Sequence, residues 1–139
     1  MQNLFIESTH STPEITFSPA ERIFRISGTS SPEDVRAMYY PVIEWIKIFV
    51  DDFLEGEYPF FTIESPLVFK IDLSYFNSSS AKFLFDILTE LKRLNEAYKP
   101  VVVEWFYDTD DPEQEEAGID LASLVEMNFK FIPKPATGK

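Results

Sequence analysis

The stretch LVFKIDLSYFNSSSAKFLFDILTELKRLNEAYKPVVVEWFYD, residues 67–108, decides the fold of this chain. Its first part, Leu67–Leu73, is short and rich in β-forming residues, which predicts a mostly buried strand. From Ala81 to Tyr98 the apolar residues recur at helical spacing and predict an amphipathic helix. Val101–Tyr107 then predicts a second buried strand. A strand, a helix and a strand in this order predict a right-handed parallel crossover.

A second helix is expected before this unit. The segment SPED, residues 31–34, is typical of a helix start, with a serine cap, proline at the first position and acidic residues facing the dipole. The helix is expected to run to about Leu54, but Pro41 lacks an amide hydrogen and predicts a kink, or a short turn and a second start. Glu55–Pro66 is expected to be a loop with a short extended piece in Phe60–Ile63, and the sequence assigns no role to its Glu57–Pro66 part.

The remaining segments extend the sheet. Alternating apolar and polar residues in Glu14–Phe17 and Arg22–Ser27, with turn residues between them, predict a hairpin. A helix is expected from near Asp111 to about Met127, followed by an edge strand at Phe129–Ile132. The predicted fold class is therefore α/β, a single domain with a mixed four- or five-stranded sheet that includes the N-terminal hairpin and is covered by helices.

The length of 139 residues suits one domain, 1–139, with one hydrophobic core. We expect an ordered core over about residues 12–132. The first 11 residues and Pro133–Lys139 have the composition of loose termini.

Composition excludes several classes of partner. The formal net charge is -12 at pH 7, so neither nucleic acid nor an anionic membrane surface is an expected partner. The chain has no apolar stretch of ~20 residues and its start lacks a signal-peptide pattern, so no membrane association is predicted. It also has no cysteine, which excludes disulfides and thiolate chemistry and suits the reducing cytoplasm.

Three consecutive serines, Ser78, Ser79 and Ser80, lie between the predicted strand and helix. A serine hydroxyl at a helix start caps free amides and contributes ~1 kcal/mol. A helix has only one N-cap, so the other serines are free to be exposed near amides that favour a phosphate group. The residues alone therefore leave two interpretations: all three serines have a structural role, or one is a phosphoacceptor or binds an anion.

No catalytic or metal site is predicted. The acidic run Asp108–Glu116 carries oxygen ligands but lacks the spacing and glycine of a calcium loop, and acidic residues also favour a helix start. His10 is the only histidine, and the chain has neither a nucleophile elbow nor a glycine-rich phosphate loop. Trp45 and Trp105 are interpreted as core packing. We therefore expect no enzyme activity, no metal and no cofactor.

The order of a strand, D-L-S and then N-S-S-S at a helix start resembles the phosphorylation segment of STAS-domain anti-sigma factor antagonists. STAS proteins usually have glycine after the serine pair, whereas this chain has Ser80 and Ala81, so the likeness is architectural and implies a STAS-like fold. The chain is more similar to the SiaC family of bacterial regulatory phosphoproteins, over nearly its whole length. The similar blocks are TPEITF (12–17), RISGTSSPED (25–34), YPVIEW (40–45), YFNSSSAK (75–82), EWFYDTDD (104–111), EEAG (115–118) and NFKFI (128–132).

The resemblance implies a non-enzymatic signalling switch in a partner-switching pathway. In that family a serine/threonine kinase phosphorylates the N-[ST]-S-S segment, a PPM-type phosphatase reverses it, and the unphosphorylated form binds and activates a diguanylate cyclase, controlling cyclic di-GMP and biofilm. By position, Ser78 after Asn77 becomes the phosphoacceptor, Ser79 or Ser80 the helix cap, and Lys82 a partner for the phosphate. The alternative is a scaffold module whose serines only cap a helix. A metal-dependent hydrolase using the acidic run is a third interpretation.

Overall fold

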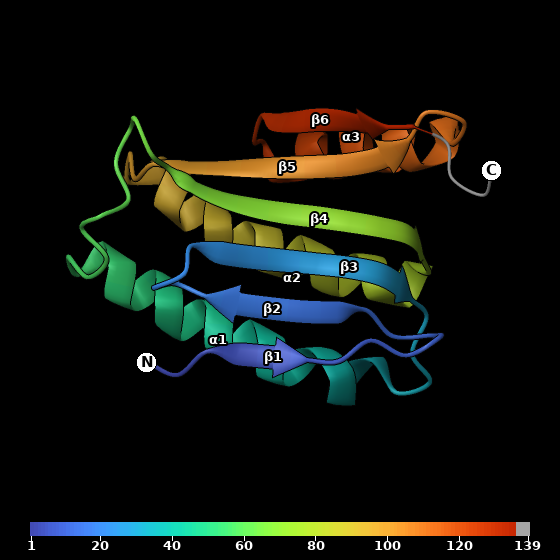
Figure 1. The fold of residues 1–139 in the computed structure, drawn as a ribbon, viewed down its shortest axis with the longest axis horizontal. Helices are drawn as coiled ribbons and strands as arrows, with labels where there is room; N and C mark the ends of the chain where they lie inside the picture. The colour runs from blue at the N-terminus through green and yellow to red at the C-terminus, as the bar shows by residue number, and fades with distance from the viewer. Residues whose placement is uncertain (136–139) are drawn as a thin grey trace.

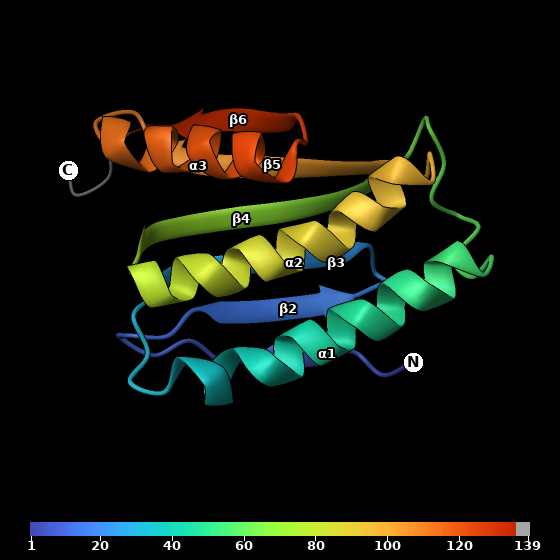
Figure 2. The same ribbon diagram turned by 180° about the vertical axis from the view of Figure 1, so that it is seen from behind.

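The protein is a two-layer α/β domain, shown in Figures 1 and 2 by a computed structural model that describes residues 1–135. Six strands form one sheet in the order β1-β2-β3-β4-β5-β6, and all three helices cover one face of it. The prediction of a mixed α/β domain is confirmed, but the predicted count of four or five strands was too low. The elements are β1 (Leu4–Ile6), β2 (Glu14–Ser18), β3 (Ile23–Ser30), α1 (Val35–Leu54), β4 (Leu67–Phe76), α2 (Ser78–Glu96), β5 (Val101–Asp108), α3 (Pro112–Val125) and β6 (Phe129–Lys134).

The order of the strands explains why the helices share a face. The pairs β1–β2 and β2–β3 are antiparallel, whereas β3–β4, β4–β5 and β5–β6 are parallel. Each parallel connection steps one strand further in the same direction, and right-handed crossovers then place every helix on the same side. The carboxyl ends of β3, β4, β5 and β6 therefore meet along one edge of the sheet, at the right in Figure 1.

The expectation of a loose N-terminus was wrong. Strand β1 pairs antiparallel with β2, and its Leu4 and Ile6 pack against the core. The indole Nε1 of Trp45 also donates a hydrogen bond to the carbonyl of Gln2 at 2.7 Å. Three residues are too few for an alternating pattern to be visible in the sequence. At the other end, Pro133 and Lys134 belong to β6, and residues 136–139 of the expected loose tail lie outside the described residues.

Helix α1 begins later than predicted and continues through its proline. Its N-cap is Asp34, whose side chain accepts from the amide of Ala37 at 3.1 Å, and not Ser31. Pro41 lies inside the continuous helix, so the predicted second start was wrong. The buried residues Tyr39 and Val42 flank the proline, and their packing favours helix on both sides despite the missing hydrogen bond.

Aromatic side chains form much of the core between the sheet and the helices. Trp45 lies against Phe17 and Phe49, with ring centroids 5.1 and 5.4 Å apart. Trp105 is fully buried and stacks on Phe129 at 6.2 Å. The prediction that both tryptophans pack in the core is therefore confirmed. In the loop between α1 and β4 the structure has turns and no strand, so the predicted extended piece at residues 60–63 was wrong.

Strand β4 continues through a bulge and ends three residues beyond its predicted end at Leu73. The register with β3 shifts between Gly28 and Thr29, and Ser74 has no partner opposite. The shift leaves Tyr75 exposed and turns Phe76 inward, where its ring lies 5.9 Å from that of Trp105. The strand therefore carries the chain to the start of α2 in a fixed orientation.

Candidate functional site

The predicted site residues all lie at the start of α2, from its N-cap Asn77 to Lys82 in the second turn. This helix follows β4 at the carboxyl-terminal edge of the sheet, where the amide of Asn77 donates to the carbonyl of Ser30 at 3.1 Å. The side chain of Asn77 accepts from the amide of Ser80 at 2.8 Å, so Asn77 is the N-cap. The prediction that Ser79 or Ser80 caps the helix was wrong. An asparagine accepts this bond as well as a serine does, and it precedes the serines.

Ser80 has a structural role that the sequence did not indicate. It is fully buried, and its hydroxyl donates to the carbonyl of Ser30 at 3.1 Å and accepts from the hydroxyl of Ser30 at 2.8 Å. The Ser30 hydroxyl also bonds the hydroxyl of Tyr39 at 2.6 Å. Burial raises the pKa of Tyr39, an effect that the hydrogen bonds with Ser30 and Ser80 partly oppose. These three residues, the buried hydroxyl cluster, join β3, α1 and α2.

Ser78 and Ser79 differ from Ser80 because both side chains are exposed. They are the first two residues of α2, and no group within residues 1–135 accepts a hydrogen bond from their amides. Free amides at a helix start carry a partial positive charge that stabilises an anion. A phosphate on either hydroxyl would therefore be placed where the backbone favours negative charge.

Lys82 lies one turn beyond Ser78 on the same side of the helix. Its ammonium group pairs with Asp86 at 2.7 Å and lies 4.9 Å from the centroid of the Phe83 ring. The lysine is exposed, so this pair is weakly held and can be exchanged. The structure thus places Lys82 within one helical turn of Ser78, paired to a neighbouring carboxylate.

A groove runs between α1 and α2 beside this turn. Its volume is ≈ 310 Å³, and Tyr40, Ile43 and Phe83 line it together with charged residues. The Tyr40 and Phe83 rings meet edge to face at 5.9 Å. The charged residues are Glu44, Lys47, Lys82 and Asp86. An apolar surface with mixed charge is typical of protein contacts.

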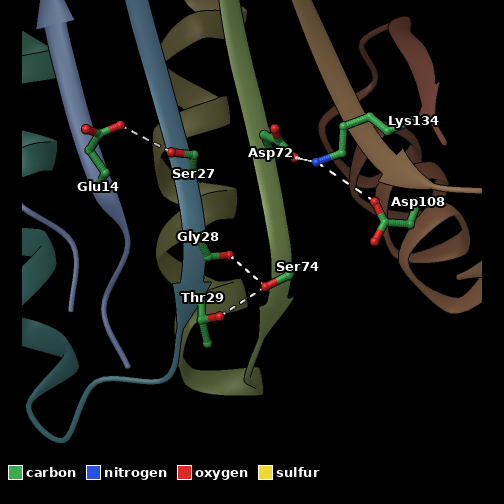
Figure 3. A network of polar contacts seen from close by, with 8 residues as sticks. All are labelled: Glu14, Ser27, Gly28, Thr29, Asp72, Ser74, Asp108 and Lys134. Carbon is green, nitrogen blue, oxygen red and sulfur yellow. Dashed lines mark hydrogen bonds and ion pairs between the residues drawn. The ribbon is translucent and has the colours of Figure 1, made fainter. Parts of the chain in front are cut away.

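A separate network of polar contacts lies on the helix-free face of the sheet, as Figure 3 shows. The bulge residue Ser74 donates to the carbonyl of Gly28 at 3.2 Å and bonds the hydroxyl of Thr29 at 3.0 Å. Gly28 has φ +112°, a backbone conformation that side chains rarely adopt. No local pattern predicted these contacts, although the glycine and the hydroxyl residues that follow it are visible in the sequence.

A second cluster of polar side chains lies further along the same face of the sheet. Lys134 pairs with Asp72 at 2.6 Å and lies 3.9 Å from Asp108 (Figure 3). A cavity of ≈ 30 Å³ beside them reaches the buried side chain of Gln114, whose Nε2 has no partner among residues 1–135. This volume suits one water molecule.

The acidic run extends from the end of β5, through a turn, into the start of α3. Asp111 is its N-cap and accepts from the amide of Gln114 at 3.1 Å, and Glu113 and Glu115 lie in the first turn. Within residues 1–135 no group of three or more His, Cys, Asp or Glu side chains is arranged to hold a metal ion. Over the same residues, no helix has the length and apolar character needed to cross a bilayer.

An exposed helix start beside a groove, with no metal-ligand cluster among residues 1–135, suits a regulatory, protein-binding domain. The model of the family described as SiaC family regulatory phosphoprotein matches residues 6–134. The chain belongs to this family. Its family relationship agrees with the prediction of a signalling protein and not an enzyme.

Known relatives support the assignment. An uncharacterized protein of Pseudomonas aeruginosa, strain UCBPP-PA14, is 32% identical over 108 residues, covering 78% of each chain. The crystal structure of apo-SiaC from Pseudomonas aeruginosa matches with a TM-score of 0.78 and 28% identity, covering 96% of this chain and 99% of that one. A chain in the crystal structure of the diguanylate cyclase SiaD in complex with its activator SiaC, from the same species, matches with a TM-score of 0.78, 27% identity and the same coverage.

Proposed function

We propose that the chain is a switch in which a serine/threonine kinase phosphorylates Ser78 and a PPM-type phosphatase removes the phosphate. In its unphosphorylated form it binds and activates a diguanylate cyclase, which raises cyclic di-GMP and favours biofilm formation. The family description and the SiaD–SiaC complex of the relative support this proposal. A chain without cysteine suits the cytoplasm as the place where it acts.

The division of roles within the first turn of α2 carries the proposal. Asn77 caps the helix and Ser80 is buried in the hydroxyl cluster, so neither role requires Ser78. Ser78 is exposed beside free amides, where a kinase can reach its hydroxyl. It also follows the asparagine directly, as the family resemblance implies for the phosphoacceptor.

A phosphate on Ser78 would act on a partner surface and leave the fold unchanged. It adds about 1.5 to 2 negative charges, and the free amides of Ser78 and Ser79 and the ammonium of Lys82 can donate hydrogen bonds to its oxygens. Lys82 would then exchange Asp86 for the phosphate. If a partner covers this turn and the adjoining groove with a surface that offers no further positive charge, burying the dianion costs several kcal/mol. Since about 1.4 kcal/mol is a tenfold change, a ~100-fold loss of cyclase affinity is expected.

The experiment compares Ser78→Ala with Ser79→Ala, a matched change at the neighbouring exposed serine. The purified chain is incubated with the cognate kinase and ATP, and the phosphate is located by peptide mass spectrometry. We expect Ser78→Ala to abolish incorporation and Ser79→Ala to retain it. Phosphate on Ser79, or none on the wild-type chain, would contradict the assignment.

A binding measurement separates the switch from the scaffold alternative. Titration of the cyclase with unphosphorylated chain, phosphorylated chain and Ser78→Asp should give tight binding only for the first. Equal affinities would show that the serine does not control the interface. A scaffold whose serines only cap the helix further requires that Ser78→Ala lowers the stability of the fold.

A further inference from the structure

Two large apolar side chains stand exposed at the end of the molecule that lies far from Ser78. Ile63, in the loop after α1, is 85% exposed, and Tyr98, just after α2, is 93% exposed. Both line one cavity of ≈ 360 Å³, called here the distal surface, which is formed by Phe53 and residues 56–59, 61–63 and 98–100. Figure 1 shows this loop at the left, at the opposite end of the sheet from the start of α2.

Folding does not explain the side chain at position 98. Tyr98 follows the end of α2 with φ 62°, in the left-handed region where glycine is the usual residue. The backbone bonds that close the helix, from Tyr98 to Asn95 at 3.1 Å and from Lys99 to Leu94 at 2.9 Å, need no side chain here. The tyrosine thus occupies a strained position and contributes almost no burial in the isolated chain.

The loop that carries Ile63 is held in place by Arg22. The guanidinium donates to the carbonyls of Phe60, at 3.2 Å, and Ser65, at 2.6 Å, and lies 4.7 Å from the Phe61 ring centroid. Phe61 itself is buried. Ile63 therefore projects from an ordered frame, and docking onto a preformed surface costs less conformational entropy than docking onto a mobile loop.

Charge around the distal surface indicates what covers it. Glu57 lines the cavity and also an adjoining cavity of ≈ 430 Å³, whose other acidic residues are Asp51, Asp52 and Glu55. Two cations line these cavities, Lys99 and Arg93, and Arg93 already pairs with Asp51 and Glu90, each at 2.8 Å. An apolar centre with an acidic rim complements apolar residues flanked by lysine or arginine. It repels a second copy of this chain, whose net charge is also -12, and an anionic membrane.

We infer that the distal surface is a second docking site, which binds a basic amphipathic segment of a partner protein. This inference goes beyond the proposed switch, because the distal surface lies at the other end of α2 from Ser78. The 19 residues of α2 separate the two by about 28 Å, at 1.5 Å per residue. Charges further apart than about 8 Å are largely screened at physiological salt. Binding at the distal surface is therefore independent of phosphorylation, so that the chain can hold one partner while it switches another.

The test uses two labelled synthetic 18-residue helical peptides, one built from leucine and lysine and the other from leucine and glutamate. Their binding is measured by fluorescence anisotropy at physiological salt. We expect the leucine–lysine peptide to bind the wild-type chain and to lose at least tenfold in affinity with Tyr98→Gly or Ile63→Ser. Leu124→Ser on α3, where Leu124 is 68% exposed, is the matched control and should change the Kd less than twofold. Ser78→Asp should also leave it unchanged.

Several outcomes would overturn the inference. Undetectable binding, equal binding of the leucine–glutamate peptide, or no loss with Tyr98→Gly and Ile63→Ser would each exclude the site. Sedimentation analysis of the chain alone gives a further outcome that would overturn it. If the wild-type chain is a dimer and Tyr98→Gly makes it a monomer, the distal surface binds a second copy of this chain. Thermal unfolding checks the reasoning about strain, since Tyr98→Gly should unfold at the same or a higher temperature than wild type. The kinase assay on Ser78 is separate, so failure of either proposal leaves the other standing.

Discussion

Replacing Asn77 and Ser78 separately by alanine tests how the start of α2 divides its roles. Asn77→Ala removes the acceptor that lies 2.8 Å from the amide of Ser80. Loss of such a cap costs about 1 kcal/mol, with a range of about 0.5–2. For a domain of this length that corresponds to a fall in Tm of roughly 3–4 °C. Ser78→Ala removes an exposed hydroxyl that makes no hydrogen bond within residues 1–135, and alanine is the better helix former. Its free energy of unfolding should stay within about 0.5 kcal/mol of wild type.

Ser80→Ala is the third variant in this comparison. The free energy of unfolding of each variant is measured by urea denaturation, followed by circular dichroism. Ser80→Ala leaves the buried hydroxyl of Ser30 with one partner fewer and should cost about 1–3 kcal/mol. The expected order of destabilisation is therefore Ser80→Ala at or above Asn77→Ala, with Ser78→Ala near zero. The reasoning would be refuted if Ser78→Ala lost as much stability as Asn77→Ala, because Ser78 would then have a structural role.

Two further predictions concern the packing behind this site. Burial raises the pKa of Tyr39 above its ordinary value of 10.0, so the folded state favours the protonated phenol. The contribution of Tyr39 to stability is therefore fully present below pH 10 and is lost as the pH rises above it. Tyr39→Phe should reduce the alkaline fall in stability measured by urea denaturation, and an unchanged fall would contradict the assignment. Gly118 faces Trp105, whose Nε1 would lie 2.5 Å from an added Cβ, so Gly118→Ala should cost about 1–3 kcal/mol by the same assay. A neutral Gly118→Ala would show that the helix α3 and the sheet are not packed this closely.

The long, periodic segments of the chain were predictable from the sequence. The apolar faces of α1 and α2 and the β-rich runs of β4 and β5 each extend over enough residues to show a period. Their order defined the parallel crossover. The position of the serine run at the junction of β4 and α2 was predictable for the same reason, since both flanking elements were clear.

The remaining features depend on contacts that a local pattern does not contain. Three residues of β1 form a strand only because β2 provides a partner. Pro41 remains within α1 because its neighbours are buried, and tertiary packing can override local propensity. The burial of Ser80 depends on Ser30, 50 positions earlier in the chain. The sequence therefore indicated three similar serines, and only the fold distinguishes the buried one from the two exposed ones.

This distinction bears on how phosphorylation would act. To unwind the start of α2, a phosphate on Ser78 would have to break the Asn77 cap and the two hydrogen bonds that Ser80 makes with Ser30. These losses amount to several kcal/mol, at about 1 kcal/mol or more for each bond. A negative charge at a helix start is instead stabilised, by about 0.3–1 kcal/mol. The helix should therefore remain folded when Ser78 carries a phosphate, and the free energy for switching must come from the partner that loses its contact with this turn.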